Sequence, residues 1–206
     1  MQLNMNPEKI GLALALALFT AAGARGAGPW YVATNGVDNS DAGRGLSWSM
    51  PYATISNAIA KAGTVANEII WVSNGVYTLT ATVNNPVAKA CRIRAASTNP
   101  ADTVLLGPGT NANFRGVSMY GAGSELQGFT VTNFYSSSGY YGVGVYCSAG
   151  LVSNCIIAGN ILNRPSQNNY GGGMYLLNGG GGRELRHYWE RYLLFTIDFR
   201  WRRDRN

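Results

Sequence analysis

Short apolar runs separated by polar turns dominate the chain from residue 30 onwards. The runs are rich in Val, Ile and aromatic residues, and Gly, Asn, Ser or Pro stands in nearly every gap between them. This pattern predicts many short β-strands joined by tight turns. The expected strands are residues 30–34, 68–72, 76–80, 91–94, 103–106, 116–119, 126–132, 142–147 and 151–158.

One segment has helical rather than strand periodicity. The apolar residues within 55–62 follow the i, i+3, i+4, i+7 spacing that places them on one face of a helix. Thr54 or Ser56 can cap its start, and Gly63 can end it. The sequence therefore predicts a short amphipathic helix, suited to sealing one end of a larger apolar core.

Two patterns recur along the chain at a long period. The Tyr-Gly pattern of residues 141–146 returns in residues 170–175, which is 29 residues later, and the apolar pattern of 126–131 returns 26 residues later in 152–157. Such a period predicts a solenoid, in which successive layers stack about 4.8 Å apart and like residues form ladders. A β-sandwich would lack this recurrence, and the signature of a leucine-rich repeat is absent. A propeller remains the alternative.

Composition agrees with a single ordered, β-rich domain. The chain has 206 residues, of which 27 are Gly, 46% are hydrophobic and only 13% are charged. The formal net charge of +6 is divided between the central region and the segment that begins at Arg183. A mildly basic surface of this kind does not predict a nucleic-acid partner.

The N-terminus has the three parts of a secretory signal peptide. Lys9 supplies a positive charge, residues 10–22 form an apolar run, and Ala22-Gly23-Ala24 supplies small residues for cleavage. We expect cleavage after Ala24 and export to the extracellular space or the outer cell surface, with the periplasm as another destination. No transmembrane segment is expected after cleavage; an uncleaved membrane anchor or a buried helix is the alternative interpretation.

The sequence divides into four segments. They are the signal peptide (1–24), an N-terminal strand, loop and capping helix (25–64), the repeated layers (65–182) and an Arg-rich tail (183–206). The tail departs from the pattern before it, because Arg becomes frequent while Gly and Asn almost vanish. We interpret it as the product of a frameshift or of a premature end of a longer gene; a genuine C-terminal capping helix is the alternative.

Neither the cysteines nor the acidic residues form a recognisable reaction centre. Cys91, Cys147 and Cys155 are odd in number and have apolar neighbours, which predicts buried thiols rather than disulfides or metal ligands. The carboxylates of the central region are scattered, and His187 is the only histidine. Glycoside hydrolysis needs paired carboxylates. We therefore assign no catalytic, cofactor-binding or metal-binding residue, and expect no cofactor.

The N-terminal half resembles the opening of a known superfamily. The resemblance rests on the segments Asn35-Gly36-Val37-Asp38, Pro51-Tyr52-Ala53-Thr54-Ile55, Ile69-Ile70-Trp71-Val72 and Gly75-Val76-Tyr77, and it extends over about residues 29–180. These are similar to secreted bacterial right-handed parallel β-helix proteins of the pectate-lyase-like superfamily. Later repeats resemble those of polymorphic outer-membrane and autotransporter-type passengers. The resemblance implies an all-β, right-handed parallel β-helix, of which this chain is an N-terminal piece.

That resemblance leaves two functions open. The first is a non-catalytic secreted or cell-surface protein of the adhesin or passenger type, which binds a polysaccharide or a cell-surface glycan. The alternative is a polysaccharide lyase or glycoside hydrolase truncated before its active site. A lyase would require calcium and an Arg base, for which Arg94 and Arg115 are the candidates; both can equally be outward-facing arginines. The oligomeric state is not predicted.

Four tyrosines are candidates for stacking against sugar rings. Tyr141 and Tyr146 are repeated as Tyr170 and Tyr175, and aromatic rings in such a series can face solvent in register. The same spacing would also produce an internal ladder of stacked side chains that serves structure alone.

Overall fold

The computed structural model describes residues 28–62, 67–138, 141–163, 171–177 and 180–188. Within them are the helix α2 (Ile55–Lys61) and two 3₁₀ turns, η1 (Pro100–Asp102) and η2 (Gly109–Asn111). The strands are β1 (Trp30–Val32), β2 (Ile69–Val72), β3 (Gly75–Thr78), β4 (Val83–Asn85), β5 (Arg92–Ala95), β6 (Thr103–Leu106), β7 (Val117–Met119), β8 (Glu125–Gln127), β9 (Thr130–Thr132), β10 (Tyr135–Ser136), β11 (Val145–Cys147), β12 (Gly150–Ala158), β13 (Ile161–Leu162), β14 (Met174–Leu176) and β15 (Gly180–Tyr188).

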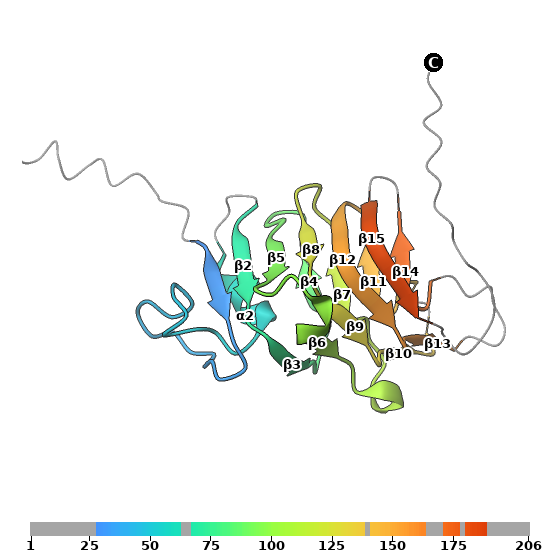
Figure 1. Ribbon diagram of the computed structural model, residues 1–206, viewed down its shortest axis with the longest axis horizontal. Coiled ribbons are helices and arrows are strands. Elements are labelled where there is room, and N and C mark those ends of the chain that lie inside the picture. The colour runs from blue at the N-terminus through green and yellow to red at the C-terminus, as the bar shows by residue number, and fades with distance from the viewer. Residues whose placement is uncertain (1–27, 63–66, 139–140, 164–170, 178–179, 189–206) are drawn as a thin grey trace, which may run out of the picture.

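The strands form parallel sheets that run along the long axis of the molecule (Figure 1). One row of neighbours is β1-β2-β5-β8, a second is β3-β6-β9, and a third is β4-β7-β11-β14. The long strand β12 joins the first two rows, because its N-terminal half pairs with β8 and its C-terminal half with β9. We call these rows the first, second and third sheets. The prediction of a β-rich chain is confirmed, and α2 is the one α-helix among the described residues.

Successive passes of the chain pair in the register that the sequence comparison suggested. Leu126 is the partner of Val152 in the first sheet, and Tyr146 is the partner of Tyr175 in the third. Equivalent side chains therefore lie above one another, one strand spacing apart.

Gly128 explains one difference from the predicted strands. Residues 126–132 form two strands, β8 and β9, because the chain turns at Gly128 with a positive φ of +85°. A Cβ atom at this position would also lie 3.0 Å from the Cβ of Ala95. The chain consequently passes from the first sheet to the second at Gly128. The apolar pattern of residues 126–132 does not reveal this turn.

One continuous apolar core lies between the sheets. The inward side chains of the third sheet include Val83, Val117 and Val145, which are in register and almost fully buried. Phe129 and Phe134 are the largest fully buried side chains. Each such side chain contributes roughly 1.5–3 kcal/mol on burial.

The helix α2 contacts β1, β2 and β4 at the N-terminal end of this core. Thr54 caps it, since its hydroxyl accepts a hydrogen bond from the backbone N–H of Asn57 at 3.2 Å. At the other end the Lys89 ammonium donates to the carbonyls of Ala60 and Ala62. The predicted helix is confirmed, and Thr54 rather than Ser56 is its cap.

A loop covers the outer edge of the first strand. The N–H of Tyr31 donates to the carbonyl of Gly45, and the carbonyl of Tyr31 accepts from Tyr52. An uncovered strand edge would be open to pairing with another chain. The N-terminal end of the first sheet is thus closed by the chain's own backbone.

Some of the predicted segments lie outside the described residues. The signal peptide and its cleavage residues, Ala22 and Ala24, are among them, as is Tyr170. Residues 183–188 belong to β15, which pairs with β12, so the boundary predicted at residue 183 falls within a strand. No helix in the part of the chain that the structure describes is long and apolar enough to cross a membrane.

Candidate functional site

The outer face of the third sheet presents one row of polar and aromatic side chains. Asn84 of β4, Ser118 of β7, Tyr146 of β11 and Tyr175 of β14 are partners in register. Because side chains alternate along a strand and the neighbours of these residues point into the core, this row points outward.

Three of the four predicted tyrosines come together on this face. The rings of Tyr146 and Tyr175 are stacked, with centroids 6.0 Å apart and planes inclined by only 11°. The ring of Tyr141 stacks on Tyr175 at 5.3 Å. Tyr120, which the sequence did not suggest, extends the series with its ring 5.6 Å from that of Tyr146.

Arg115 covers the same stack. Its guanidinium carbon lies 4.5 Å from the centroid of the Tyr146 ring, and its Nε donates to the backbone carbonyl of Tyr141 at 2.9 Å. Because β11 lies between β7 and β14, Arg115 meets Tyr146 from the β7 side and Tyr175 meets it from the β14 side. The ring of Tyr146 therefore contacts protein groups on both sides rather than offering a bare face to a sugar.

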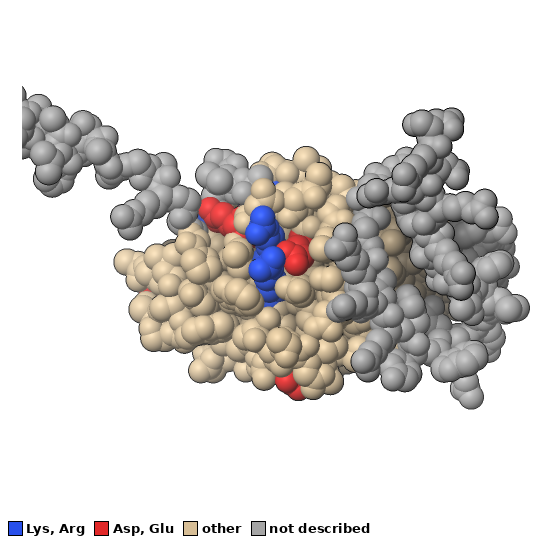
Figure 2. Space-filling view, turned by 45° about the horizontal axis from the view of Figure 1, so that its top comes forward, with Lys and Arg blue, Asp and Glu red and all other residues tan. Residues whose placement is uncertain are grey.

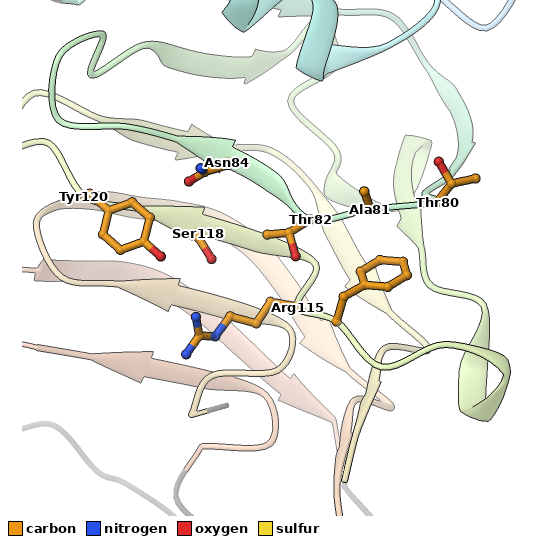
Figure 3. Close-up of a pocket in the computed structure, with 8 residues that line it drawn as sticks. Thr80, Ala81, Thr82, Asn84, Arg115, Ser118 and Tyr120 are labelled. Carbon is orange, nitrogen blue, oxygen red and sulfur yellow. The ribbon is translucent and has the colours of Figure 1, made fainter. Parts of the chain in front are cut away.

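Beside this stack the surface is hollowed into a depression of about 490 Å³ (Figure 3). It is lined by residues 80–82, Asn84, Phe114, Arg115, Ser118 and Tyr120. In Figure 3 the hydroxyls of Thr82, Ser118 and Tyr120 point toward the side on which Arg115 lies.

The polar side chains of the depression are not used by the fold. Ser118 is only 2% exposed. Within the described part of the chain its hydroxyl has no hydrogen-bond partner, and neither do the side chains of Thr80, Thr82, Asn84 and Tyr120. Thr80 and Asn84 are exposed, so these groups can hydrogen-bond to water, and the buried hydroxyls without a partner lie elsewhere, at Thr103, Ser124 and Ser153. The depression thus presents hydroxyl and amide groups that are accessible to a polar ligand.

The charge of the depression comes from a single residue. Among the described residues of its lining, Arg115 is the one cation and none is a carboxylate. A guanidinium presents several N–H donors in a fixed plane. The depression thus combines hydroxyl, amide and guanidinium groups with the aromatic walls of Phe114 and Tyr120.

The carboxylates of the described residues form structural contacts elsewhere. Asp38 accepts from the backbone N–H groups of residues 53 and 54, and Asp41 pairs with Arg44 at 2.7 Å. Asp102 accepts from Ser97, and Glu68 accepts from the indole N–H of Trp30. No group of three His, Cys, Asp or Glu side chains suited to a metal ion occurs within these residues.

The outer face of the first sheet carries most of the visible charge. Figure 2 shows a narrow strip of basic side chains with acidic ones on either side of it, and a separate acidic patch at the lower edge. Here Arg94 forms an ion pair with Glu125, with an Nη2–Oε2 distance of 2.7 Å and a second bond from Nε at 3.1 Å. Arg94 lies on β5 of the first sheet and Arg115 in the segment that precedes β7, so the two candidate bases of the lyase interpretation lie apart, and each contacts a neighbouring group.

The three cysteines are buried thiols. Burial raises the pKa of Cys91, Cys147 and Cys155 to about 11. For Cys91 the negative charge of Glu68 adds to this effect. Thiols with such a pKa are largely protonated at neutral pH and make weak nucleophiles.

Comparison with known proteins adds no assignment to this geometry. No family model matches the chain, and no curated protein or solved structure with significant similarity was found.

Sequence reasoning identified the tyrosines but not the depression beside them. Its lining comes from two separated segments, 80–84 and 114–120, and no motif links Thr82, Ser118 and Tyr120. The available signal was the small residue Ser118 at the position where the two later strands of the same sheet carry Tyr146 and Tyr175.

Proposed function

We propose that the chain is a secreted or cell-surface protein of the right-handed parallel β-helix class, and that the outer face of its third sheet binds a glycan. The signal-peptide pattern of residues 1–24 supports export. Parallel pairing in every sheet and the recurrence of partners at successive passes support the solenoid. The resemblance to the pectate-lyase-like superfamily supports the same class.

The observation that carries the binding proposal is the set of unused polar groups in the depression. A sugar ring offers many hydroxyls, each of which can donate and accept. Five polar side chains of the lining (Thr80, Thr82, Asn84, Ser118 and Tyr120) lack a partner within the described residues, and the nearby Phe114 and Arg115 complete a surface with apolar, polar and cationic parts. Binding sites commonly combine aromatic walls with a few placed hydrogen-bonding groups in this way.

A glycan-binding screen with one isosteric variant tests the proposal. The secreted chain is applied to immobilised plant, bacterial and animal glycans, and the affinity for the strongest ligand is then measured by calorimetry. Tyr120→Phe removes one hydroxyl from the depression and keeps the ring that contacts Tyr146. We expect the dissociation constant to rise roughly three- to tenfold, the contribution of one neutral hydrogen bond.

Tyr31→Phe is the matched control, because Tyr31 lies on β1 in the first sheet and outside the depression. Its affinity should equal that of the unmodified protein. Absence of binding to every glycan class, or equal losses in both variants, would contradict the proposed function.

A further inference from the structure

The tyrosines of the third sheet form one continuous run of ring contacts. Tyr175 of β14 stacks on Tyr146 of β11 with centroids 6.0 Å apart, and on Tyr141 at 5.3 Å. The ring of Tyr120 lies 5.6 Å from that of Tyr146. All four side chains are partly exposed, and they come from three successive passes of the chain. The fold thus brings phenol rings that are distant in the sequence into contact at the surface.

Phenol rings in contact can be joined by oxidation. A tyrosine that loses one electron and its phenolic proton becomes a phenoxyl radical, whose unpaired electron is shared between the oxygen and the ring carbons ortho to it. Two such radicals form a carbon–carbon bond between these positions, and the hydrogen of each bonded carbon moves to the phenolic oxygen, which gives dityrosine. In total the pair loses two hydrogen atoms, and hydrogen peroxide accepts them and becomes two molecules of water. Rings already held together react without a prior collision.

The position of Arg115 favours one pair within this run. Its guanidinium carbon lies 4.5 Å from the centroid of the Tyr146 ring. A cation over an aromatic ring is attracted by the electrons of that ring, so it opposes the removal of an electron from Tyr146. Tyr141 and Tyr175 have the shortest centroid distance of the run, 5.3 Å. Tyr141 also precedes β11 and is not held in a strand, which leaves its ring room to approach Tyr175 edge to edge.

We infer that Tyr141 and Tyr175 are an oxidative cross-linking site, at which hydrogen peroxide and a peroxidase form dityrosine. The link joins two passes of the chain that are 175 − 141 = 34 residues apart, as disulfides do in many exported proteins. The three cysteines are free, buried thiols, so the described residues contain no disulfide that could fasten these layers. This inference goes beyond glycan binding and does not depend on it.

Treatment of the dilute, folded protein with a peroxidase and hydrogen peroxide tests the inference. We expect dityrosine fluorescence to appear and the mass of the chain to fall by that of two hydrogen atoms, while the chain remains monomeric on a denaturing gel. Peptide mapping by mass spectrometry should locate the bond between Tyr141 and Tyr175. Tyr141→Phe and Tyr175→Phe should each lose most of the fluorescence, because phenylalanine has no phenolic O–H to give up.

Two further variants serve as controls, and circular dichroism establishes that each variant is folded. Tyr31→Phe is the matched control, since the ring of Tyr31 contacts Trp48 rather than another tyrosine. Tyr146→Phe tests the choice of pair. Both should give the same fluorescence as the unmodified protein. Absence of dityrosine within single chains, a bond mapped to Tyr146 instead of Tyr141, or an undiminished yield in the folded Tyr141→Phe variant would overturn the inference. If Tyr175→Phe does not fold, Tyr141→Phe and the peptide map still decide.

Discussion

Two asparagines in equivalent turns, Asn133 between β9 and β10 and Asn160 between β12 and β13, show how single residues hold adjacent layers together. Asn133 adopts a positive φ of 62° and donates from its side chain to the carbonyl of Gly107. Asn160 is fully buried; its amide donates to the carbonyl of Val131 at 2.9 Å, and its oxygen accepts from the N–H of Phe134 at 3.1 Å. Each asparagine side chain thus hydrogen-bonds to a backbone group that would otherwise lack a partner at the turn.

Substitution of Asn160 should therefore be costly. Asn160→Ala leaves the buried N–H of Phe134 without its partner, which should lower the free energy of unfolding by about 2 kcal/mol. Urea denaturation followed by circular dichroism measures this loss. Asn163→Ala, at an exposed asparagine whose side chain is 3.4 Å from the Tyr135 hydroxyl, should cost under about 0.5 kcal/mol. Equal stability of the two variants would refute the role given to Asn160.

The buried thiols predict a stability that falls at high pH. Burial holds the pKa of all three cysteines at about 11, against 9.0 for a reference thiol. Between pH 9 and pH 11 the unfolded chain therefore loses thiol protons that the folded chain retains, so unfolding becomes more favourable as pH rises. The contribution of each thiol, up to roughly 2 kcal/mol, is fully present below pH 9.

Chemical denaturation at a series of pH values measures how far the free energy of unfolding falls between pH 9 and pH 11. The Cys155→Ala variant has one buried thiol fewer and should show a smaller fall. A stability that is flat from pH 9 to pH 11, or an equal fall in the variant, would contradict burial of this thiol in the folded protein.

At the scale of elements, the sequence predicted the limits of the helix α2 closely and those of β6 to the residue. The apolar stripe and the polar start of α2 are local features, and both are realised in Ile55, Ile59 and the Thr54 cap. The strands β4, β10, β13, β14 and β15 were not among those predicted. The first four have only two or three residues, and β15 begins in a run of glycines; all five pair with strands of neighbouring layers.

Removal of the helix cap is the prediction that belongs to this scale. Thr54→Ala takes away the acceptor for the N–H of Asn57, and the free energy of unfolding should fall by about 1 kcal/mol. Ser56→Ala is the matched control, since Ser56 is exposed and does not serve as the cap. Chemical denaturation of both variants decides between them, and a larger loss at Ser56 would show that the helix begins elsewhere.

For the whole molecule, the sequence indicated a β-rich chain with recurring layers, because apolar patterns repeat wherever equivalent strands stack. It could not indicate where a binding surface lies. The proposed binding surface depends on which outward side chains from separate passes become neighbours. A ladder of stacked tyrosines was one of the two alternatives that the sequence left open, whereas the contact of Arg115 with Tyr146 became apparent only from the three-dimensional arrangement.

The most direct test of glycan binding at the depression is a crystal structure of the chain with the best glycan from the screen. The predicted result is a sugar in the depression, with hydrogen bonds from its hydroxyls to the side chains of the lining. A glycan found on another face, with the depression filled only by water, would contradict the account.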